Sequence, residues 1–335
     1  MRKGLFIWLV FVLLSCEKDP EIPVGKGNFV DVATTAVTGI QDTRANSGIS
    51  ISNLTGNYIV QERGICWGIN QNPSIDNLSY RASSNAESMV LYDLIPGQKY
   101  YVRAYAKING VYTYGNQREF TSTTASNMTS GLVTYLPLNE DSKDYSSSGN
   151  NLTGNAVKTI SRNGVINGAF AFNGANQYLT LLSPKNLPEN NNAYSFSFWF
   201  KANVWNREMA IFGFGPSGTI AASNYVKVMP SGGLLHYHWS LDNQFTSAFF
   251  TGLWTHLVVT YDGSTERYYI NGQPQRNWLH PTSPLFVKPS ILSLGARVVT
   301  LSTNDIKEYF NGAIDDVRIY NRSLSQLEAS ILFSL

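Results

Sequence analysis

Apolar and polar side chains alternate with a period of two along much of the chain. In residues 100–108 the even positions are tyrosine, valine, alanine and isoleucine, whereas Arg103 and Lys107 stand at odd positions. This period predicts a strand with one buried face. The Asn-Gly pair at 109–110 is favoured in two-residue type I′ hairpin turns, so residues 111–114 are predicted to return as the partner strand.

Turn signals repeat through the second part of the chain, and each Asn-Gly or Asp-Gly pair predicts a hairpin or tight turn. The one convincing helix start is Ser325, with Glu328 three residues later as a capping box and a short terminal turn expected through Ile331. About 200 residues of strands without helices predict a large sandwich or jelly roll. The pairs stand at 163–164, 167–168, 173–174, 262–263, 271–272 and 311–312.

Changes of pattern divide the chain. Arg2 and Lys3 precede an apolar run from Leu5 to Leu14, which is shorter than the ~20 residues that a membrane-spanning helix needs. A Ser- and Thr-rich stretch later separates two regions of strands. The predicted parts are a signal peptide (1–16), a tether (17–28), a first sandwich (29–124), a linker (125–131) and a second, larger sandwich (132–335).

Composition narrows the class of protein further. Charged residues make up 14% and aromatic residues 13% of the chain, an all-β composition with few charges. The net charge of +2 provides no basic surface for nucleic acid. Of the two cysteines, Cys16 ends the signal peptide and Cys66 lies in an apolar strand, where it is expected to act as a small buried hydrophobe.

Residues 13–16 resemble a lipobox, and the charged stretch 17–21 resembles the surface-export signal of lipoproteins from the Bacteroidetes. The resemblance implies lipid on Cys16, attachment to the outer membrane and exposure at the cell surface. A solvated linker that faces the periplasm remains the alternative.

Residues 62–68, 72–75 and 100–106 resemble a fibronectin type III-like module of Bacteroidetes surface proteins. A Leu-x-Pro-Gly turn at 94–97 stands just before Tyr100, where such sandwiches place a tyrosine corner. The resemblance implies an immunoglobulin-like sandwich that serves as a spacer.

The second region resembles the laminin-G-like, concanavalin A-like lectin (jelly-roll) family. The resemblance rests on residues 132–138, 194–201, 254–263 and 310–325. It implies a concanavalin A-like jelly-roll sandwich after the immunoglobulin-like one, so the whole chain is expected to be all-β. A fold of this kind determines architecture better than it determines ligand.

The resemblance also implies a calcium site. In this family the loop that contains Asp144 and Asn150 often lies near the last strand, which here carries Asp315 and Asp316, and the two regions share a structural calcium. Carboxylate and amide oxygens suit this hard cation. The alternatives are turn chemistry at Asp144 and pairing of Asp316 with an arginine.

Aromatic residues outside the core are candidates for a glycan site, because sugar C–H faces pack on aromatic rings and hydroxyls need polar partners. In residues 194–201, three phenylalanines share the core face, which leaves Trp199 at the rim of a groove or under a loop. The residues expected to contact a ligand are Trp205, His238, Trp239 and Trp278.

Catalysis is disfavoured. The chain has no Glu-x-Asp-x-Glu run, and the adjacent pairs at 140–141 and 315–316 are predicted to point to opposite faces of a strand, so neither pair can flank one glycosidic bond. His236 and His238 share a strand face that could hold zinc, but no third ligand is evident nearby. No nucleophile elbow, P-loop or dinucleotide fingerprint is present.

The sequence therefore predicts a non-catalytic surface lipoprotein that binds polysaccharide or mediates adhesion, with the first sandwich as spacer and the second as ligand head. The alternatives are a glycoside hydrolase of the same fold and a structural or protein-binding surface module. The expected partners are a glycan and, through the lipid on Cys16, a membrane; nucleic acid is not expected. The sequence predicts neither which glycan is bound nor any outer-membrane uptake partner.

Overall fold

The computed structural model describes residues 30–54, 56–123, 128–216, 219–230, 232–246, 251–279, 284–299 and 305–335, without the side chains of 245–246 and 276–279. The predicted signal peptide, the lipidation residue Cys16 and the tether lie outside the described residues. Strands dominate the described part of the chain, which confirms the predicted all-β class. No helix within these ranges is both long and apolar enough to span a bilayer.

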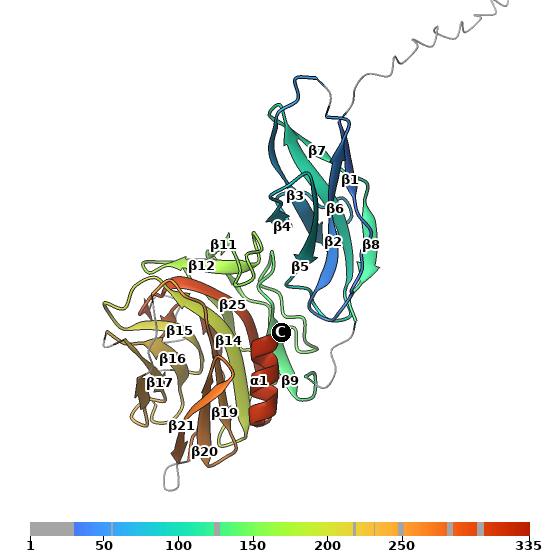
Figure 1. Ribbon diagram of the computed structural model, residues 1–335. Coiled ribbons are helices and arrows are strands. Elements are labelled where there is room, and N and C mark those ends of the chain that lie inside the picture. Colours follow the sequence, from blue (N-terminus) through green and yellow to red (C-terminus); the bar gives the residue numbers. More distant parts are fainter. Residues whose placement is uncertain are drawn as a thin grey trace, which may run out of the picture.

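The first sandwich packs a small sheet on a larger one (Figure 1). Its core lies between the two sheets and includes Ile49, Trp67 and Leu91. The small sheet contains β1 (Asp31–Thr34), β2 (Ala45–Ser52) and β5 (Ala86–Leu91). The larger sheet contains β3 (Val60–Gly68), β4 (Leu78–Arg81), β6 (Lys99–Ile108), β7 (Val111–Tyr114) and β8 (Arg118–Thr121).

Local sequence signals account for this sandwich. The even positions of β6, from Tyr100 to Ile108, are buried as predicted. Asn109 and Gly110 have φ of 49° and 88° and join β6 to β7, which is the predicted type I′ turn. The Ile95 N–H donates to the Tyr100 hydroxyl at 2.9 Å, which confirms the tyrosine corner.

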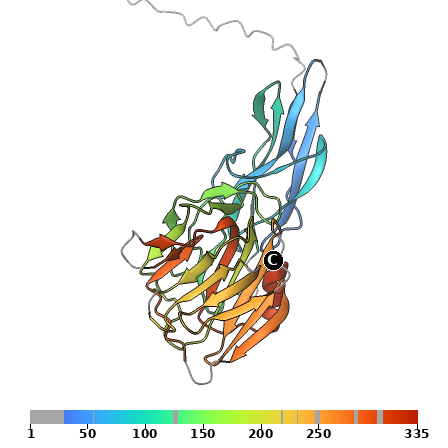
Figure 2. The ribbon, with the colours of Figure 1, turned by 90° about the vertical axis from the view of Figure 1, so that its left-hand side faces the viewer.

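The second sandwich is larger (Figures 1 and 2). One sheet contains β10 (Thr153–Gly154), β13 (Leu179–Leu182), β22 (Ile291–Leu294), β15 (Met209–Phe214), β16 (Asn224–Val228), β17 (Gly233–Tyr237) and β18 (Asn243–Thr246). The other contains β11 (Val157–Thr159), β12 (Ala169–Asn173), β25 (Asn311–Tyr320), β14 (Tyr194–Ala202), β19 (Thr255–Tyr261), β20 (Thr265–Ile270) and β21 (Gln273–Leu279), with β9 (Leu132–Leu136) beside β25. β23 (Arg297–Val298) pairs with β24 (Ile306–Lys307).

The core of this sandwich is strongly aromatic, and Phe196, Phe198 and Phe200 of β14 lie in it as the alternation predicted. Helix α1 (Gln326–Ser334) packs on the outer face of the β14 sheet through a separate apolar cluster that includes Leu332. The capping box of Ser325 and Glu328 is present, and the helix extends past the predicted end.

One predicted turn is wrong. Asn311 and Gly312 open β25 instead of forming a turn. A β-carbon on Gly312 would lie 2.2 Å from the Lys201 carbonyl oxygen of the neighbouring strand, so the glycine permits close backbone approach. The Asn271-Gly272 pair does form a tight turn, with φ of 49° and 73°, between β20 and β21.

Hydrogen bonds join the two sandwiches. The Leu78 N–H donates to Glu140 Oε1 at 2.6 Å, and Asn77 Nδ2 donates to Glu140 Oε2 at 3.2 Å. Asn163 Nδ2 donates to Asp93 Oδ1 at 2.8 Å, which connects the β11–β12 loop to the first sandwich. These bonds position a cavity between the two sandwiches.

Candidate functional site

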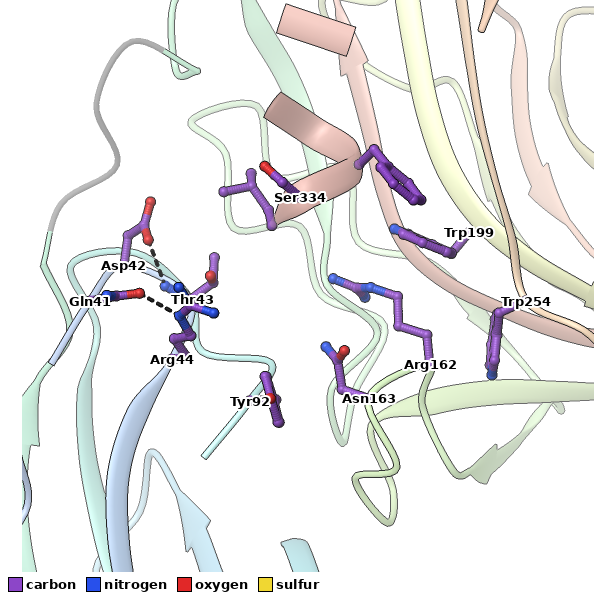
Figure 3. A pocket seen from close by; sticks show the side chains of 12 residues that line it. Gln41, Asp42, Thr43, Arg44, Tyr92, Arg162, Asn163, Trp199, Trp254 and Ser334 are labelled. Carbon is purple, nitrogen blue, oxygen red and sulfur yellow. Dashed lines mark hydrogen bonds between the residues drawn. The ribbon is translucent and has the colours of Figure 1, made fainter. Parts of the chain in front are cut away.

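A cavity of about 380 Å³ lies where the first sandwich meets the β14 sheet (Figure 3). In Figure 3 the turn that contains Arg44 faces Arg162, Trp199 and Trp254 across the cavity, and Tyr92 adds an aromatic ring on the side of the first sandwich. The lining residues are Gln41, Asp42, Thr43, Arg44, Tyr92, Arg162, Asn163, Trp199, Trp254, Phe333, Ser334 and Leu335.

Trp199 forms one wall because β14 alternates. Its neighbours Phe198 and Phe200 point into the core, so the Trp199 indole points out of the sheet and is half-buried. Phe333 of α1 stacks on this ring with centroids 5.5 Å apart. Of the two places expected for Trp199, the rim of a groove and burial under a loop, the structure has the first, and its Nε1–H has no hydrogen-bond partner.

Two cationic side chains lie over the tryptophan rings that line the cavity. The Arg162 guanidinium lies 5.1 Å from the centroid of Trp199, and Lys201 Nζ lies 5.3 Å from the centroid of Trp254. Both distances suit cation–π attraction. The cavity therefore has ring faces, a guanidinium and the Asn163 amide around one space.

The guanidinium of Arg162 forms ion pairs with two carboxylates. Its Nη1 lies 2.9 Å from Asp315 Oδ2 and its Nη2 3.2 Å from Asp316 Oδ2, while Arg318 Nη1 lies 2.8 Å from Asp316 Oδ2. Burial raises the pKa of the Asp315 carboxyl well above its usual value even though Arg162 opposes this shift. For Arg162, burial disfavours the charge, but Asp315 and Asp316 raise its pKa overall.

The carboxylate pair corrects one prediction. Asp315 and Asp316 were expected to point to opposite faces of a strand, yet both contact Arg162. Asp316 has φ of 52°, and the pairing of β14 with β25 shifts register between Ser197 and Trp199. This irregularity breaks the alternation, as β-bulges do.

The residues predicted to hold calcium have protein partners in the structure. Asp144 Oδ1 accepts from the backbone N–H groups of Tyr135 and Ser146, each at 2.8 Å. Asn150 Oδ1 accepts from the Lys185 N–H at 2.7 Å. These bonds, with the arginine pairing of Asp315 and Asp316, match the alternatives to calcium. A calcium site shared by the loop and the last strand stays a prediction.

The predicted ligand-contacting residues do not line this cavity where the structure describes their side chains. Trp205 packs against the core, and Trp239 lies edge-on to Tyr237 with centroids 5.9 Å apart. Trp278 pairs with Glu266 through its backbone, but its side chain lies outside the described residues. His238 is fully buried, which corrects the expectation that it contacts a glycan.

His238 instead belongs to an interior cluster with His236 and Glu266, whose ligand atoms lie within 4.8 Å of one another. Sequence reasoning missed Glu266, the third member of the cluster, because it lies 28 residues beyond His238. Its signal was the alternation of β20, in which Glu266 shares the inward face with Tyr268 and Ile270.

His256 was predicted to be structural, and it is fully buried with Nε2 2.8 Å from Ser197 Oγ. Burial, together with the charges of Arg162 and Arg318, lowers the pKa of His256 well below its usual value, so its imidazole is neutral. It supports the wall of the cavity from beneath Trp199, at 5.0 Å between ring centroids.

The geometry of the second sandwich agrees with its sequence family. Residues 173–330 match the concanavalin A-like lectin/glucanases superfamily, as the family Laminin_G_3. Those residues carry a concanavalin A-like domain. The predicted jelly-roll class is thereby confirmed, and Trp199 and Trp254 of the cavity belong to this concanavalin A-like domain.

Solved structures are similar in fold. A mutant of HCR/D is 14% identical, with a TM-score of 0.50 over 62% of this chain and 53% of that one. The botulinum neurotoxin serotype D binding domain is 14% identical, with a TM-score of 0.47 over 62% of this chain and 51% of that one. The chain thus spans about half the length of these two proteins.

Domain 4 of AbnA, an extracellular arabinanase from Geobacillus stearothermophilus solved with arabinotriose, is 22% identical, with a TM-score of 0.46 over 60% of this chain and 97% of that domain. No curated protein matches the sequence. The HCR/D mutant, with its TM-score of 0.50, is similar to the concanavalin A-like domain in fold alone.

Proposed function

We propose that the protein is a non-catalytic carbohydrate-binding lipoprotein and that its sugar site is the cavity between the two sandwiches. The observation that carries this proposal is the combination of Trp199, Trp254 and Tyr92 with Arg162 and Asn163 around about 380 Å³. This volume falls in the range of small-ligand sites, ~300–1,000 Å³. Indole faces can pack on sugar C–H groups while the guanidinium and the amide bond hydroxyls.

The carboxylates favour binding over hydrolysis. Glycosidases use two carboxyl groups that flank the scissile bond, ~5–9.5 Å apart. Among the described lining residues, Asp42 is the one acidic side chain, and Asp315 is paired with Arg162 and buried. A cavity with this lining can hold a sugar through contacts without supplying an acid and a nucleophile.

The site is composite in this proposal. Arg44 and Tyr92 come from the first sandwich, which therefore contributes a wall in addition to acting as a spacer. Binding is expected to be weak, about micromolar to millimolar in Kd. Many lipid-anchored copies on one surface would bind a long polymer at several points. The resulting high effective concentration would compensate for the weak affinity of each site.

The test is a glycan array on residues 28–335, followed by calorimetry with a sugar that binds. Trp254→Ala should weaken binding about tenfold or more, or about 1.4 kcal/mol, because it removes a stacking face. Trp239→Ala is the matched control, since Trp239 is also half-buried but lies outside the cavity. Melting curves of both variants show that the fold persists.

Each outcome has a distinct meaning. If Trp239→Ala weakens binding and Trp254→Ala does not, a sugar site exists elsewhere and the cavity is wrongly assigned. If no glycan binds the intact protein, the carbohydrate function is wrong. Release of reducing ends from a bound polysaccharide would show instead that the protein is a glycoside hydrolase.

The lipid anchor has its own test. Acyl chains contribute about 0.8 kcal/mol per buried CH₂, which is enough for stable attachment when several chains are present. Cys16→Ala should abolish labelling by a fatty-acid analogue and release the protein from the membrane fraction. Equal labelling of both proteins would contradict the anchor without affecting the sugar site.

A further inference from the structure

A polar cluster lies inside the second sandwich, away from the cavity between the sandwiches. His236 and His238 come from β17 and its end, in one sheet, and Glu266 comes from β20, in the other. All three side chains are fully buried. His238 Nε2 lies 2.9 Å and His236 Nδ1 3.3 Å from the same oxygen, Glu266 Oε1.

The outer ring nitrogens of both histidines are held by protein oxygens. His238 Nδ1 donates to the Ser223 carbonyl oxygen at 2.9 Å, and His236 Nε2 donates to Asn224 Oδ1 at 2.7 Å. Metal-binding histidines are held in this way, because a hydrogen bond at one nitrogen fixes the tautomer that presents the other nitrogen's lone pair. Here the other nitrogen of His238 faces Glu266, and that of His236 lies between Glu266 Oε1 and the Tyr268 hydroxyl, at 3.3 and 3.0 Å.

The Glu266 carboxylate is also held by hydrogen bonds from protein side chains. Tyr194 Oη donates to Glu266 Oε1 at 2.6 Å, and Tyr268 Oη donates to Oε2 at 2.7 Å. With its Nδ1–H donating to Ser223, His238 faces Glu266 Oε1 through an Nε2 that carries either a second proton or a lone pair that a metal cation can bind. A bound cation would compete with that one proton and would neutralise the Glu266 carboxylate in a fully buried site.

We propose that His236 Nδ1, His238 Nε2 and Glu266 bind a structural zinc ion that links the two sheets of the concanavalin A-like domain. Two imidazoles and a carboxylate suit zinc better than calcium, which takes mainly oxygen ligands. Donor atoms around a tetrahedral zinc lie about 3.3 Å apart, and here His236 Nδ1 and His238 Nε2 lie 3.3 and 2.9 Å from Glu266 Oε1. The Tyr268 hydroxyl, which donates to Glu266 Oε2, also lies 3.0 Å from His236 Nδ1 and supports both ligands from the outer shell.

This site is independent of sugar binding, because its residues are buried and none of them lines the cavity. Its role would be to join β17 and β20 across the core. A ligand that binds only the folded state stabilises it in proportion to ln(1 + [L]/Kd). The domain should therefore melt at a higher temperature with zinc than with a chelator.

The experiment measures zinc in the full-length protein purified from zinc-supplemented cells. We expect about one zinc ion per chain, and visible d–d absorption typical of tetrahedral coordination when cobalt replaces zinc. Glu266→Gln and His238→Asn should lower zinc affinity about tenfold or more, measured by competition with a chromophoric chelator. His256→Asn is the matched control, because it also removes a fully buried imidazole but lies outside the cluster.

The proposal is overturned if the wild-type protein contains no zinc and shows no tetrahedral cobalt spectrum. It is also overturned if Glu266→Gln binds zinc as tightly as the wild type, because the ion then lies elsewhere. If the cluster variants fail to fold, the cobalt spectrum and zinc content of the wild type decide the question alone.

Discussion

Asp315 and Asp316 are consecutive residues of β25, and both carboxylates contact the guanidinium of Arg162, at 2.9 and 3.2 Å. The left-handed φ of 52° at Asp316 turns its side chain toward the same face as that of Asp315. These contacts are made by the Oδ2 atoms, whereas Asp315 Oδ1 and Asp316 Oδ1 have no hydrogen-bond partner. Arg162 is therefore the ion-pair partner of Asp315, shares Asp316 with Arg318, and also lies over Trp199 in the cavity wall.

Removal of this guanidinium should destabilise the protein strongly. Arg162→Met leaves Asp315 buried without its partner, and breaking a buried pair typically costs about 3–5 kcal/mol. Lys158→Met, an exposed change on the neighbouring β11, should cost less than about 0.5 kcal/mol. Urea unfolding of both variants measures the difference. Equal stability of the two would show that Arg162 does not compensate the carboxylates.

The capping box of α1 should give the protein a pH-dependent stability. The hydrogen bond from Arg322 is the main cause that lowers the pKa of Glu328, from 4.5 to about 2. A lowered pKa means that the stabilisation is fully present above pH 4.5 and is lost as the pH falls toward 2. The stability difference between wild type and Glu328→Gln should shrink over this window in chemical unfolding. A constant difference across it would contradict the assignment.

The same cap has a simpler test at neutral pH. Ser325 Oγ accepts from the Glu328 N–H at 3.3 Å and begins the helix. Ser325→Ala should lower the free energy of unfolding by about 1 kcal/mol, whereas Ser325→Asp should nearly preserve it, since aspartate also caps helices. If both variants lose the same stability, capping is not the cause.

Cys66 should be inert in the native protein. Its thiol is fully buried, with Sγ 3.3 Å from the carbonyl oxygens of Pro73 and Arg103, and burial raises its pKa to about 12. The thiolate that alkylating reagents need is therefore scarce at pH 8. In a Cys16→Ser background, iodoacetamide should label Cys66 only after denaturation. Rapid labelling of the folded protein would show that this strand opens.

Glu140 should hold the two sandwiches together. Its carboxylate accepts from the Leu78 N–H and the Asn77 amide of the first sandwich. Glu140→Ala should leave each sandwich folded but increase interdomain motion, seen as a larger radius of gyration in small-angle scattering. Asp141→Ala is the control, because Asp141 pairs with Lys143 of its own loop. An unchanged scattering curve for Glu140→Ala would assign the domain contact to other residues.

Much of the local structure could be predicted because short-range patterns carry it. The alternation from Tyr100 to Ile108, the Asn109-Gly110 turn and the Ser325 cap each depend on residues a few positions apart, and all three are found as predicted. The core face of Phe196, Phe198 and Phe200 follows from the same period of two. The sequence determined the all-β class and these elements by itself, because backbone preference and side-chain alternation act within one strand or turn.

Only the tertiary structure decided which side chains meet. Arg162 and Asp315 are 153 residues apart, and His238 and Glu266 are 28 apart on different sheets. Their contacts depend on strand register, on the irregularity at Asp316 and on how the sheets stack, and no periodic signal encodes these. For the same reason the cavity formed around Trp199, Trp254 and Tyr92 instead of the tryptophans that the sequence favoured: its walls come from two domains whose packing is a property of the folded chain.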